Sequence, residues 1–414
     1  MTGLAAAALA GLLGAGCSLA YDWDECGVDA DCDPFETAGQ DLVCKATKCV
    51  SASGQTGKLP RVAYLYVGPV GDYGWTKTHD EGRLALEAAF PGIDTTFSPS
   101  VAPADAPAAI DQFIADGYDL VIGTSHDFLS QIQSAAANNT STKFLLTAGF
   151  VTSPNLGSYM GRMDQPKWLA GRLAAKMSKT KRLGYVSSIV IPETISHINA
   201  FTLGARSVDP DVVVMATFIG AWFAPDEEAA AANLLIDDGV DVITNGTDTP
   251  ATIEAAEKRK TADDRQVLSI GYDNPTTCEL FGPKGCIASA YYNWGPMIVR
   301  LVTQIRDGTW DPRAIVWDRM TGDSESSPVY LTSPSPTLVP SNVRVDVEGY
   351  ISKFASGELD VFAGDINDNQ GGTRTGLDDE DVLRMCWFVD GVVEPAANPP
   401  FAPKAVGAGC IGDP

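Results

Sequence analysis

Basic residues are scarce in this chain of 414 residues. It has 29 Lys and Arg against 53 Asp and Glu, which gives a formal net charge of -24. Such an excess of carboxylates repels phosphate groups, so it argues against nucleic acid as a partner and against an electrostatic grip on anionic lipid. A solvated acidic surface accounts for the charge without any binding role.

Histidine is rarer still, with three in the whole chain. His79, His126 and His197 fall near predicted strand ends, which leaves a metal-binding receptor as one hypothesis, but they lack the tight spacing of metal ligands. An α/β hydrolase needs a nucleophile elbow, and Gly123-Thr-Ser-His-Asp127 has Asp where the last Gly of that motif belongs. We therefore predict no bound metal, no cofactor and no enzymatic activity.

Long apolar runs are lacking near the start of the chain. Residues 4–16, LAAAALAGLLGAG, are too few to span a bilayer as a helix, and they end in small residues before Cys17. This pattern is typical of a secretory signal with a lipoprotein cleavage site, although no Lys or Arg precedes the run and Gly14 stands where Leu is usual. We expect residues 1–16 to be a signal peptide and Cys17 to be lipidated; ordinary secretion and a buried thiol are the alternatives.

The other eight cysteines favour export and disulfides. Residues 24–49 are polar and have too few apolar side chains for a core, so two disulfides are expected to hold this segment. A zinc site is the alternative there, although neither a CxxC spacing nor a His is present. Cys278 is expected to pair with Cys286, and Cys386 with Cys410. The pairing within the N-terminal segment stays open among three connectivities of Cys26, Cys32, Cys44 and Cys49.

From residue 60 onward, apolar runs alternate with segments of helical length. Val62-Ala-Tyr-Leu-Tyr-Val67 predicts a strand buried on both faces, and residues 68–74 predict a Gly- and Pro-rich turn before an amphipathic helix. Strands and helices that alternate in this way predict βαβ units and a parallel sheet.

A short internal repeat predicts two lobes of the same topology. Residues 113–124, FIADGYDLVIGT, are similar to residues 235–246, LIDDGVDVITNG. Two facing α/β lobes make a cleft between the carboxyl ends of their strands. The expected boundaries are 17–58 for a lipidated Cys-rich module and linker, 59–180 with 292–320 for lobe I, 181–291 with 321–394 for lobe II, and 395–414 for a tail.

Short motifs in a fixed order carry a family resemblance over about residues 60–393. They are VGPVGDYGWTKTHDEGR at 67–83, IPETISHINAF at 191–201, WFAP at 222–225, TDTP at 247–250, GYD at 271–273, NWGP at 293–296 and WFVDGV at 387–392. The chain thus resembles the basic membrane protein family, lipid-anchored solute-binding proteins of ABC importers that include purine nucleoside receptors.

The resemblance implies a bilobal α/β fold of the periplasmic-binding-protein type I class, with three hinge crossings. It also implies an ABC permease as partner and a place in the cell envelope, either periplasmic or on the outer surface. We expect a monomer. A surface sensor or adhesin of the same fold, without a transporter, is the alternative.

Aromatic and polar side chains follow the predicted strands of both lobes. Aromatic faces can stack a heterocycle, and carboxylates can accept hydrogen bonds from ring N–H and amino groups. The alternative is that the carboxylates cap helix N-termini, which we favour for Asp164 and Asp226. The candidate ligand-binding residues are Asp72, Tyr73, Trp75, His126 and Phe128 in the first lobe, and Glu193, Trp222, Asp248, Asp273, Asn293 and Trp294 in the second.

The resemblance also implies which part of the ligand each of these residues contacts. Aromatic residues from both lobes sandwich a purine, and Asp72 holds its edge. Asp273 and a Lys on the next strand grip the ribose in the nucleoside receptors, but Ala290-Tyr-Tyr-Asn293 contains no Lys. We therefore expect a purine base such as adenine to bind better than a nucleoside.

Overall fold

The computed structural model describes residues 42–45, 48–51 and 57–395. Contacts divide the chain into a small unit, Met1–Leu59 with Thr303–Trp310, and a large unit, Pro60–Val302 with Asp311–Pro414. In the small unit, β1 (Leu42–Lys45) and β2 (Lys48–Ser51) form an antiparallel hairpin in which Cys44 lies opposite Cys49. The predictions for Cys17, Cys26, Cys32 and Cys410 fall outside the described residues.

The first sheet of the large unit belongs to lobe I. Its strands run in the order β13-β7-β6-β5-β3-β4 and are all parallel. Helices α2 and α3 cover one face, where Phe113 and Ile132 pack on strand residues such as Val121. Helix α1 packs against the start of α9, where Gly82 lies against Trp294. The elements are β3 (Val62–Leu65), α1 (Trp75–Ala89), β4 (Thr95–Ser98), α2 (Ala106–Ala115), β5 (Leu120–Gly123), the 3-10 turn η3 (His126–Phe128), α3 (Leu129–Asn138), β6 (Lys143–Thr147), β7 (Leu156–Gly161), α9 (Trp294–Asp307) and β13 (Val316–Asp318).

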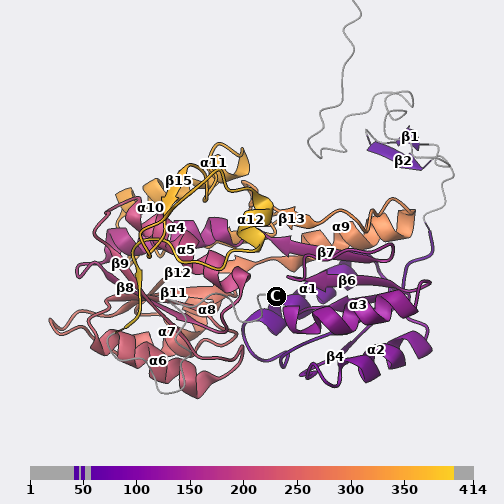
Figure 1. The fold of residues 1–414 in the computed structure, drawn as a ribbon, viewed down its shortest axis with the longest axis horizontal. Coiled ribbons are helices and arrows are strands. Elements are labelled where there is room, and N and C mark those ends of the chain that lie inside the picture. Colours follow the sequence, from indigo (N-terminus) through magenta and orange to yellow (C-terminus); the bar gives the residue numbers. More distant parts are fainter. Residues whose placement is uncertain (1–41, 46–47, 52–56, 396–414) are drawn as a thin grey trace, which may run out of the picture. The chain divides into compact units, whose positions relative to one another are not determined.

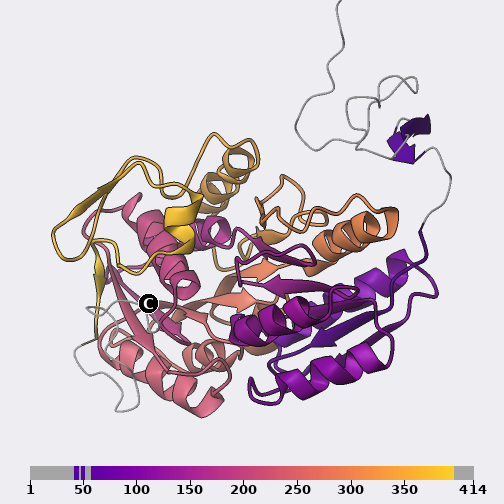
Figure 2. The same ribbon diagram turned by 45° about the vertical axis from the view of Figure 1, so that its right-hand side comes forward.

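The second sheet forms lobe II. Its order is β14-β12-β11-β10-β8-β9-β17, parallel except where β14 runs antiparallel to β12. Figure 1 shows α6, α7 and α8 on one face and α4 and α5 on the other, and Figure 2 shows the yellow C-terminal segment on the α4–α5 side. The elements are α4 (Asp164–Met177), β8 (Arg182–Ser187), α5 (Pro192–Arg206), β9 (Val213–Phe218), α6 (Pro225–Asp237), β10 (Val242–Gly246), α7 (Ala251–Glu257), β11 (Leu268–Asp273), α8 (Thr277–Phe281), β12 (Cys286–Tyr292), β14 (Val329–Leu331), α10 (Ser341–Glu348), α11 (Ile351–Ala355), the hairpin β15 (Asp365–Asn367) and β16 (Thr373–Thr375), α12 (Asp379–Leu383) and β17 (Val392–Val393).

Within residues 57–395 the chain crosses between the two sheets three times, after β7, after β12 and after β13. The prediction of two α/β lobes with parallel sheets is therefore confirmed. Helix α4 packs against α5, β12 and β14, all elements of lobe II. A Cβ on Gly171 would overlap Phe201 O, and one on Gly204 would overlap Trp168 O. These two glycines let α4 and α5 touch backbone to backbone, which ties α4 to lobe II.

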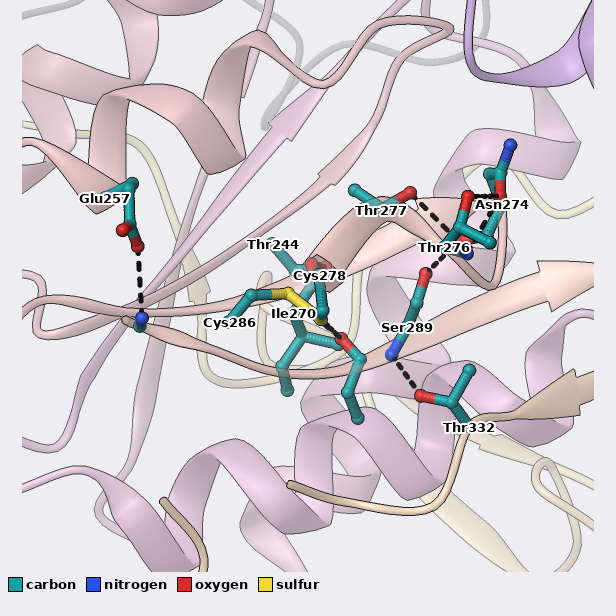
Figure 3. The surroundings of a disulfide bond; sticks show 12 residues. Thr244, Glu257, Ile270, Asn274, Thr276, Thr277, Cys278, Cys286, Ser289 and Thr332 are labelled. Carbon is teal, nitrogen blue, oxygen red and sulfur yellow. Dashed lines mark hydrogen bonds between the residues drawn. A yellow bond between two sulfur atoms is a disulfide. The ribbon is translucent and has the colours of Figure 1, made fainter. Parts of the chain in front are cut away.

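The predicted disulfide between Cys278 and Cys286 is present and joins α8 to the start of β12 (Figure 3). Near the Cys286 end of the loop, the Glu257 carboxylate accepts hydrogen bonds from Lys284 N and Gly285 N, each with a distance of 3.1 Å. Cys386 is also disulfide-bonded. Among the described helices, none is both long enough and apolar enough to cross a membrane.

Candidate functional site

The loops that follow strands of both sheets enclose one cavity in the large unit. Its empty volume is about 250 Å³, part of it open to solvent. Lobe I contributes the residues after β3, β5 and β6, and lobe II contributes those after β8, β9 and β10. The lining residues are Val67, Trp75, Ser125, His126, Ala148, Glu193, Trp222 and Asp248. Of the predicted site residues, Trp75, His126, Glu193, Trp222 and Asp248 thus meet at this cavity.

Asp72 caps helix α1. Its Oδ1 accepts hydrogen bonds from Gly74 N at 2.9 Å and Lys77 N at 3.0 Å, and its Oδ2 accepts one from Thr76 N at 2.9 Å. Burial raises the pKa of this carboxyl, while the backbone donors oppose the shift. Because both oxygens already serve the first turn of the helix, Asp72 has little capacity left for the edge of a ligand.

The two aromatic residues of the same turn point to different places. Tyr73 has a φ of 60° and is 44% exposed, and its ring meets Phe281 of lobe II edge-on at 5.0 Å, so it does not line the cavity. Trp75 is buried, and its Nε1 donates a hydrogen bond to Thr124 O at 2.5 Å. That bond fixes the orientation of the Trp75 ring, which forms a wall of the cavity.

Behind Trp75 lies a cluster of aromatic rings. Trp294 stacks on Tyr292 with ring centroids 4.4 Å apart and on His79 with centroids 4.2 Å apart, and Trp75 meets both Tyr292 and Trp294 edge-on. Trp294 is 1% exposed and lies outside the cavity lining. It packs among these rings at the second crossing between the lobes.

Two further predicted ligand residues have structural roles. Phe128 is fully buried in the lobe I core with Ile132 and Leu146. Asn293 Nδ2 donates hydrogen bonds to the carbonyl oxygens of Ser324 and Glu325, so it ties the second crossing to the third. Neither side chain lines the cavity. A residue that directly follows a strand thus need not face the cleft, because the first turn after a strand also supplies core contacts.

The two lobes touch each other at this cavity. Trp222 Nε1 of lobe II donates a hydrogen bond to Asp127 Oδ2 of lobe I at 3.1 Å, and within lobe II Trp222 O accepts one from Asp248 N at 3.0 Å. A Cβ on Gly74 would lie 2.5 Å from Asp248 O. The loop after β3 therefore lies against the loop after β10, with the cavity beside this contact.

Three carboxyl groups lie on the lobe II side of the site: Asp248 and Asp273 are buried, and Glu193 is partly buried. Burial and the charge of Asp127 raise the pKa of Glu193 to about 8. Burial raises the pKa of Asp248, and Asp273 raises it further. Asp273 is fully buried at a φ of 64°, and neither of its oxygens has a hydrogen-bond partner among the described residues. Burial raises the pKa of Asp273 too, although Lys167 opposes the shift.

The sequence reasoning missed Lys167. This residue of α4 is fully buried, its Nζ donates a hydrogen bond to Asn245 O at 2.6 Å, and its ammonium lies 3.8 Å from the centroid of the Tyr272 ring. Burial lowers the pKa of Lys167 to about 7, and Asp273 opposes that shift. One signal was available, because a Lys in the first turn of a helix opposes the helix dipole and so needs another partner.

The histidines do not gather around one point. His79 stacks in the aromatic cluster, His126 lines the cavity with Nδ1 3.2 Å from Ala148 O, and His197 lies on α5. Burial lowers the pKa of His79 and of His197, and Lys167 lowers that of His197 further. Over the described residues, no group of three or more His, Cys, Asp or Glu is placed to hold a metal ion.

Known proteins resemble this chain over most of its length. The family described as ABC transporter substrate-binding proteins, PnrA-like, matches residues 59–322. The chain belongs to that family. A purine-binding protein of Brucella abortus is 34% identical over 80% of this chain and 92% of its own length. A putative ABC transporter glucose-binding protein of Haloferax volcanii is 31% identical over 81% of each chain.

Solved structures agree on the architecture of this PnrA-like substrate-binding protein. A solute-binding protein of an ABC transporter system from Aeropyrum pernix has a TM-score of 0.62 at 17% identity and covers 78% of this chain and 95% of its own. One from Conexibacter woesei has a TM-score of 0.58 at 23% identity and covers 73% and 98%. The fold is thus that of type I periplasmic binding proteins, as predicted, and the family is extracytoplasmic.

Proposed function

We propose that this protein is the receptor of an ABC importer and that it binds a purine, as a base or a nucleoside, between its two lobes. One observation carries the proposal. Trp75 of lobe I and Trp222 of lobe II line the same cavity, beside the carboxyl groups of Glu193 and Asp248. Flat rings and carboxyl groups together suit a flat heterocycle with polar edges.

The protonation of these carboxyl groups matters for the choice of ligand. With a pKa of about 8, Glu193 carries a proton at neutral pH, so it can both donate and accept a hydrogen bond. Purine edges present ring nitrogens that accept hydrogen bonds and N–H groups that donate them. A site with both capacities therefore matches a purine better than a row of ionised carboxylates does.

The position of Lys167 bears on whether the ligand is a purine base or a nucleoside. The lack of a Lys on β12 favoured a base, because the resemblance pairs such a Lys with Asp273 for the ribose. Lys167 places an ammonium near Asp273 from α4 instead. The absence on β12 therefore no longer argues against a nucleoside, and both ligand types belong in the test.

Calorimetry on the purified protein with adenine, guanine, adenosine, inosine and glucose tests the proposal. We expect at least one purine to bind and glucose to bind more weakly than that purine. Glucose belongs in the set because the Haloferax relative carries that ligand in its name. Binding of glucose without binding of any purine would overturn the ligand assignment and leave the family and the fold intact.

We further propose that the protein acts as a lipid-anchored monomer that delivers its ligand to a permease and catalyses no reaction. The proposal of an anchor at Cys17 depends on the small residues before it. Globomycin should make the precursor accumulate. A mature protein that begins elsewhere and carries no lipid would remove the anchor but not the receptor. A gene neighbourhood without a permease and an ATPase would favour the sensor or adhesin.

A further inference from the structure

Carboxyl groups of the two lobes face one another where the lobes touch. In lobe I, Asp127 accepts the hydrogen bond that Trp222 Nε1 of lobe II donates at 3.1 Å, and Asp72 lies at the start of α1. In lobe II, Glu193 of the first turn of α5 and Asp248 of the loop after β10 both line the cavity between the lobes. Like charges that are brought together away from water repel each other, so contact between the lobes costs free energy when all of these groups are ionised.

Glu193 and Asp248 sense the approach of lobe I. Burial, and then the charge of Asp127, raise the pKa of Glu193 to about 8. Burial also raises the pKa of Asp248, Asp72 is among the charges that raise it further, and Gly74 of lobe I lies against the Asp248 backbone. If the lobes part, water reaches both carboxyls and the charges of lobe I move away, so both pKa values return toward their ordinary range. The lobes in contact therefore hold protons that the parted lobes release.

Other titratable groups surround Glu193. His126 lines the same cavity from lobe I, and Asp164 and His197 line an adjoining cavity of about 310 Å³, part of it open to solvent, with Glu193. Arg162 Nη2 lies 3.6 Å from Asp164 Oδ2. The groups of lobe II whose pKa values respond to the charge of Glu193 also include Tyr185, Tyr272, Asp273 and Tyr292.

Most of these groups keep one charge in both arrangements of the lobes. Burial raises the pKa values of the three tyrosines and lowers that of His197, so all four side chains stay neutral. Asp164 keeps Arg162 beside it, because the two are near neighbours in the chain. A proton on His126 at low pH would add a positive charge beside the carboxyls, which acts in the same direction as protons on the carboxyls themselves.

Lys167 acts with the opposite sign but is independent of lobe I. Burial lowers its pKa to about 7, and Asp273 opposes that shift. Its Nζ donates to Asn245 O and lies over the Tyr272 ring, and both residues belong to lobe II. The surroundings of Lys167 and Asp273 thus move together with lobe II, so parting of the lobes changes their titration much less than that of Glu193.

We propose that the two lobes take up protons at their facing carboxyl groups when they close, so that low pH closes the protein and high pH opens it. A carboxyl with a higher pKa in the closed arrangement favours that arrangement fully at low pH and loses this contribution as the pH rises through the closed value. For Glu193, the window runs from the ordinary pKa of a glutamate up to about 8. This inference concerns the movement of the lobes, so it goes beyond the proposed ligand and does not depend on it.

Small-angle X-ray scattering of the ligand-free full chain at pH 6, 7.5 and 9 tests the inference. We expect the radius of gyration to be smaller at pH 6 than at pH 9, because hinge motion of two lobes changes the overall dimensions. Far-UV circular dichroism at each pH checks that the chain stays folded. An equal radius at all three pH values would overturn the inference, whatever ligand the protein binds.

Two variants assign the effect to the facing carboxyls. Asp127→Asn removes the charge opposite Glu193 but keeps a side-chain oxygen for Trp222 Nε1, and Asp127 does not line the cavity. Glu193→Gln removes the titrating group itself. The radius of each variant should change less between pH 6 and pH 9 than that of the native protein. Asp111→Asn is the control, because it removes the same charge from an exposed position on α2 and should keep the native dependence. Native behaviour of both test variants would overturn the inference.

Calorimetry gives a second readout if a purine binds. The affinity of the native protein should fall about tenfold or more between pH 6 and pH 8, because closure and binding are linked. The binding enthalpy at pH 7.5 should also depend on the ionisation enthalpy of the buffer, which reports proton uptake. Affinity that is independent of pH would overturn the inference, and so would a pH-dependent affinity with a constant radius, since Glu193 would then serve the ligand alone. If no purine binds, the proposed function fails, and the scattering data still decide this inference.

Discussion

At the scale of single residues, Trp75 and Trp222 face the same cavity from different surroundings. Trp75 is 7% exposed, is held by Thr124 O and touches the rings of Tyr292 and Trp294. Trp222 is half-buried on a loop, and its Nε1 donates a hydrogen bond to Asp127. Loss of Trp75 would therefore damage packing as well as binding, whereas loss of Trp222 tests binding more cleanly.

Trp222→Ala should weaken binding of the purine about tenfold, because stacking on an aromatic ring contributes about 1–3 kcal/mol per base. The melting temperature of the protein without ligand should stay nearly the same. Phe223→Ala is the matched control. Phe223 is the next residue in the chain, is 46% exposed, and does not line the cavity that Trp75 and Trp222 share. Calorimetry and a thermal melt on each variant give the answer; equal losses of affinity in the two variants would contradict the stacking role.

Two aspartates show why residue roles were hard to predict. Asp72 follows a strand and was expected to face the ligand, yet it caps α1 through three backbone N–H groups. Asp164 begins a helix and was expected to cap it, yet neither of its oxygens has a hydrogen-bond partner among the described residues. The same residue type at the same kind of boundary takes either role, and the course of the backbone over the next few residues decides which.

At the scale of elements, the lobe II core depends on a buried carboxyl between two helices. Glu228 of α6 is fully buried, and its oxygens accept hydrogen bonds from Thr252 N at 2.9 Å and Thr249 Oγ1 at 2.5 Å, at the start of α7. The contact ties the first turns of α6 and α7 together. Burial raises the pKa of Glu228 to about 7, although these donors oppose the shift.

Glu228→Gln should reduce the loss of stability as pH rises. Between pH 4.5 and 7 the folded protein keeps a proton on Glu228 that the unfolded chain releases, so the stability of the native protein falls through this window. A neutral Gln cannot titrate, so the variant should lack a pH-dependent loss on the order of 3 kcal/mol. Urea unfolding at pH 5 and pH 7.5 measures the difference.

Glu227→Gln serves as the control for this measurement, because Glu227 is the exposed neighbour in the same turn. Its pH dependence should match that of the native protein. Other buried groups, such as Glu193 and Lys167, titrate in all three proteins and cancel in the comparison. Parallel pH profiles for native protein and Glu228→Gln would contradict a proton on Glu228.

The Cys278–Cys286 disulfide belongs to the same scale, since it joins α8 to β12. Replacing both cysteines with Ser should lower the free energy of unfolding by about 2–3 kcal/mol, because the loop they close restricts the unfolded chain. Urea unfolding without reductant keeps the other disulfides intact. An unchanged unfolding midpoint would show that the Glu257 contacts to Lys284 and Gly285 hold the loop without the disulfide.

At the scale of the large unit, the close approach of two loops sets how far the lobes can close. Gly74 of lobe I lies against the backbone of Asp248 in lobe II, so any side chain at this position would meet Asp248 O at 2.5 Å. Trp222 and Asp127 bridge the same two lobes. Closure around a ligand, as hinge motion allows in such receptors, needs these loops to meet.

Gly74→Ala should therefore weaken ligand binding about tenfold or more, because the added methyl group opposes the closed arrangement. The stability of the ligand-free protein should change much less, since the lobes can part. Gly71→Ala is the control, as a Cβ at Gly71 would meet nothing within 4 Å. Calorimetry with the best purine measures the effect, and unchanged affinity in Gly74→Ala would show that closure does not require this contact.

The sequence by itself determined the architecture and the family. Apolar runs such as Val62–Leu65 and Leu120–Gly123 became fully buried parallel strands, because a parallel sheet covered on both faces admits few polar side chains. The pairing of Cys278 with Cys286 followed from their short separation. Local periodicity and spacing carry this information, so it can be obtained without knowing which elements pack against each other.

Only the tertiary structure decided which side chains meet. Lys167 approaches Asp273 from more than 100 residues away in the chain, and Asp164 lies beside Glu193 and His197 because α4 packs on α5 through Gly171 and Gly204. The sequence shows that each of these residues is polar and close to the end of an element. It does not show which carboxyls find backbone donors and which are left without them. That depends on contacts between distant segments, which form when the two sheets and their helices assemble.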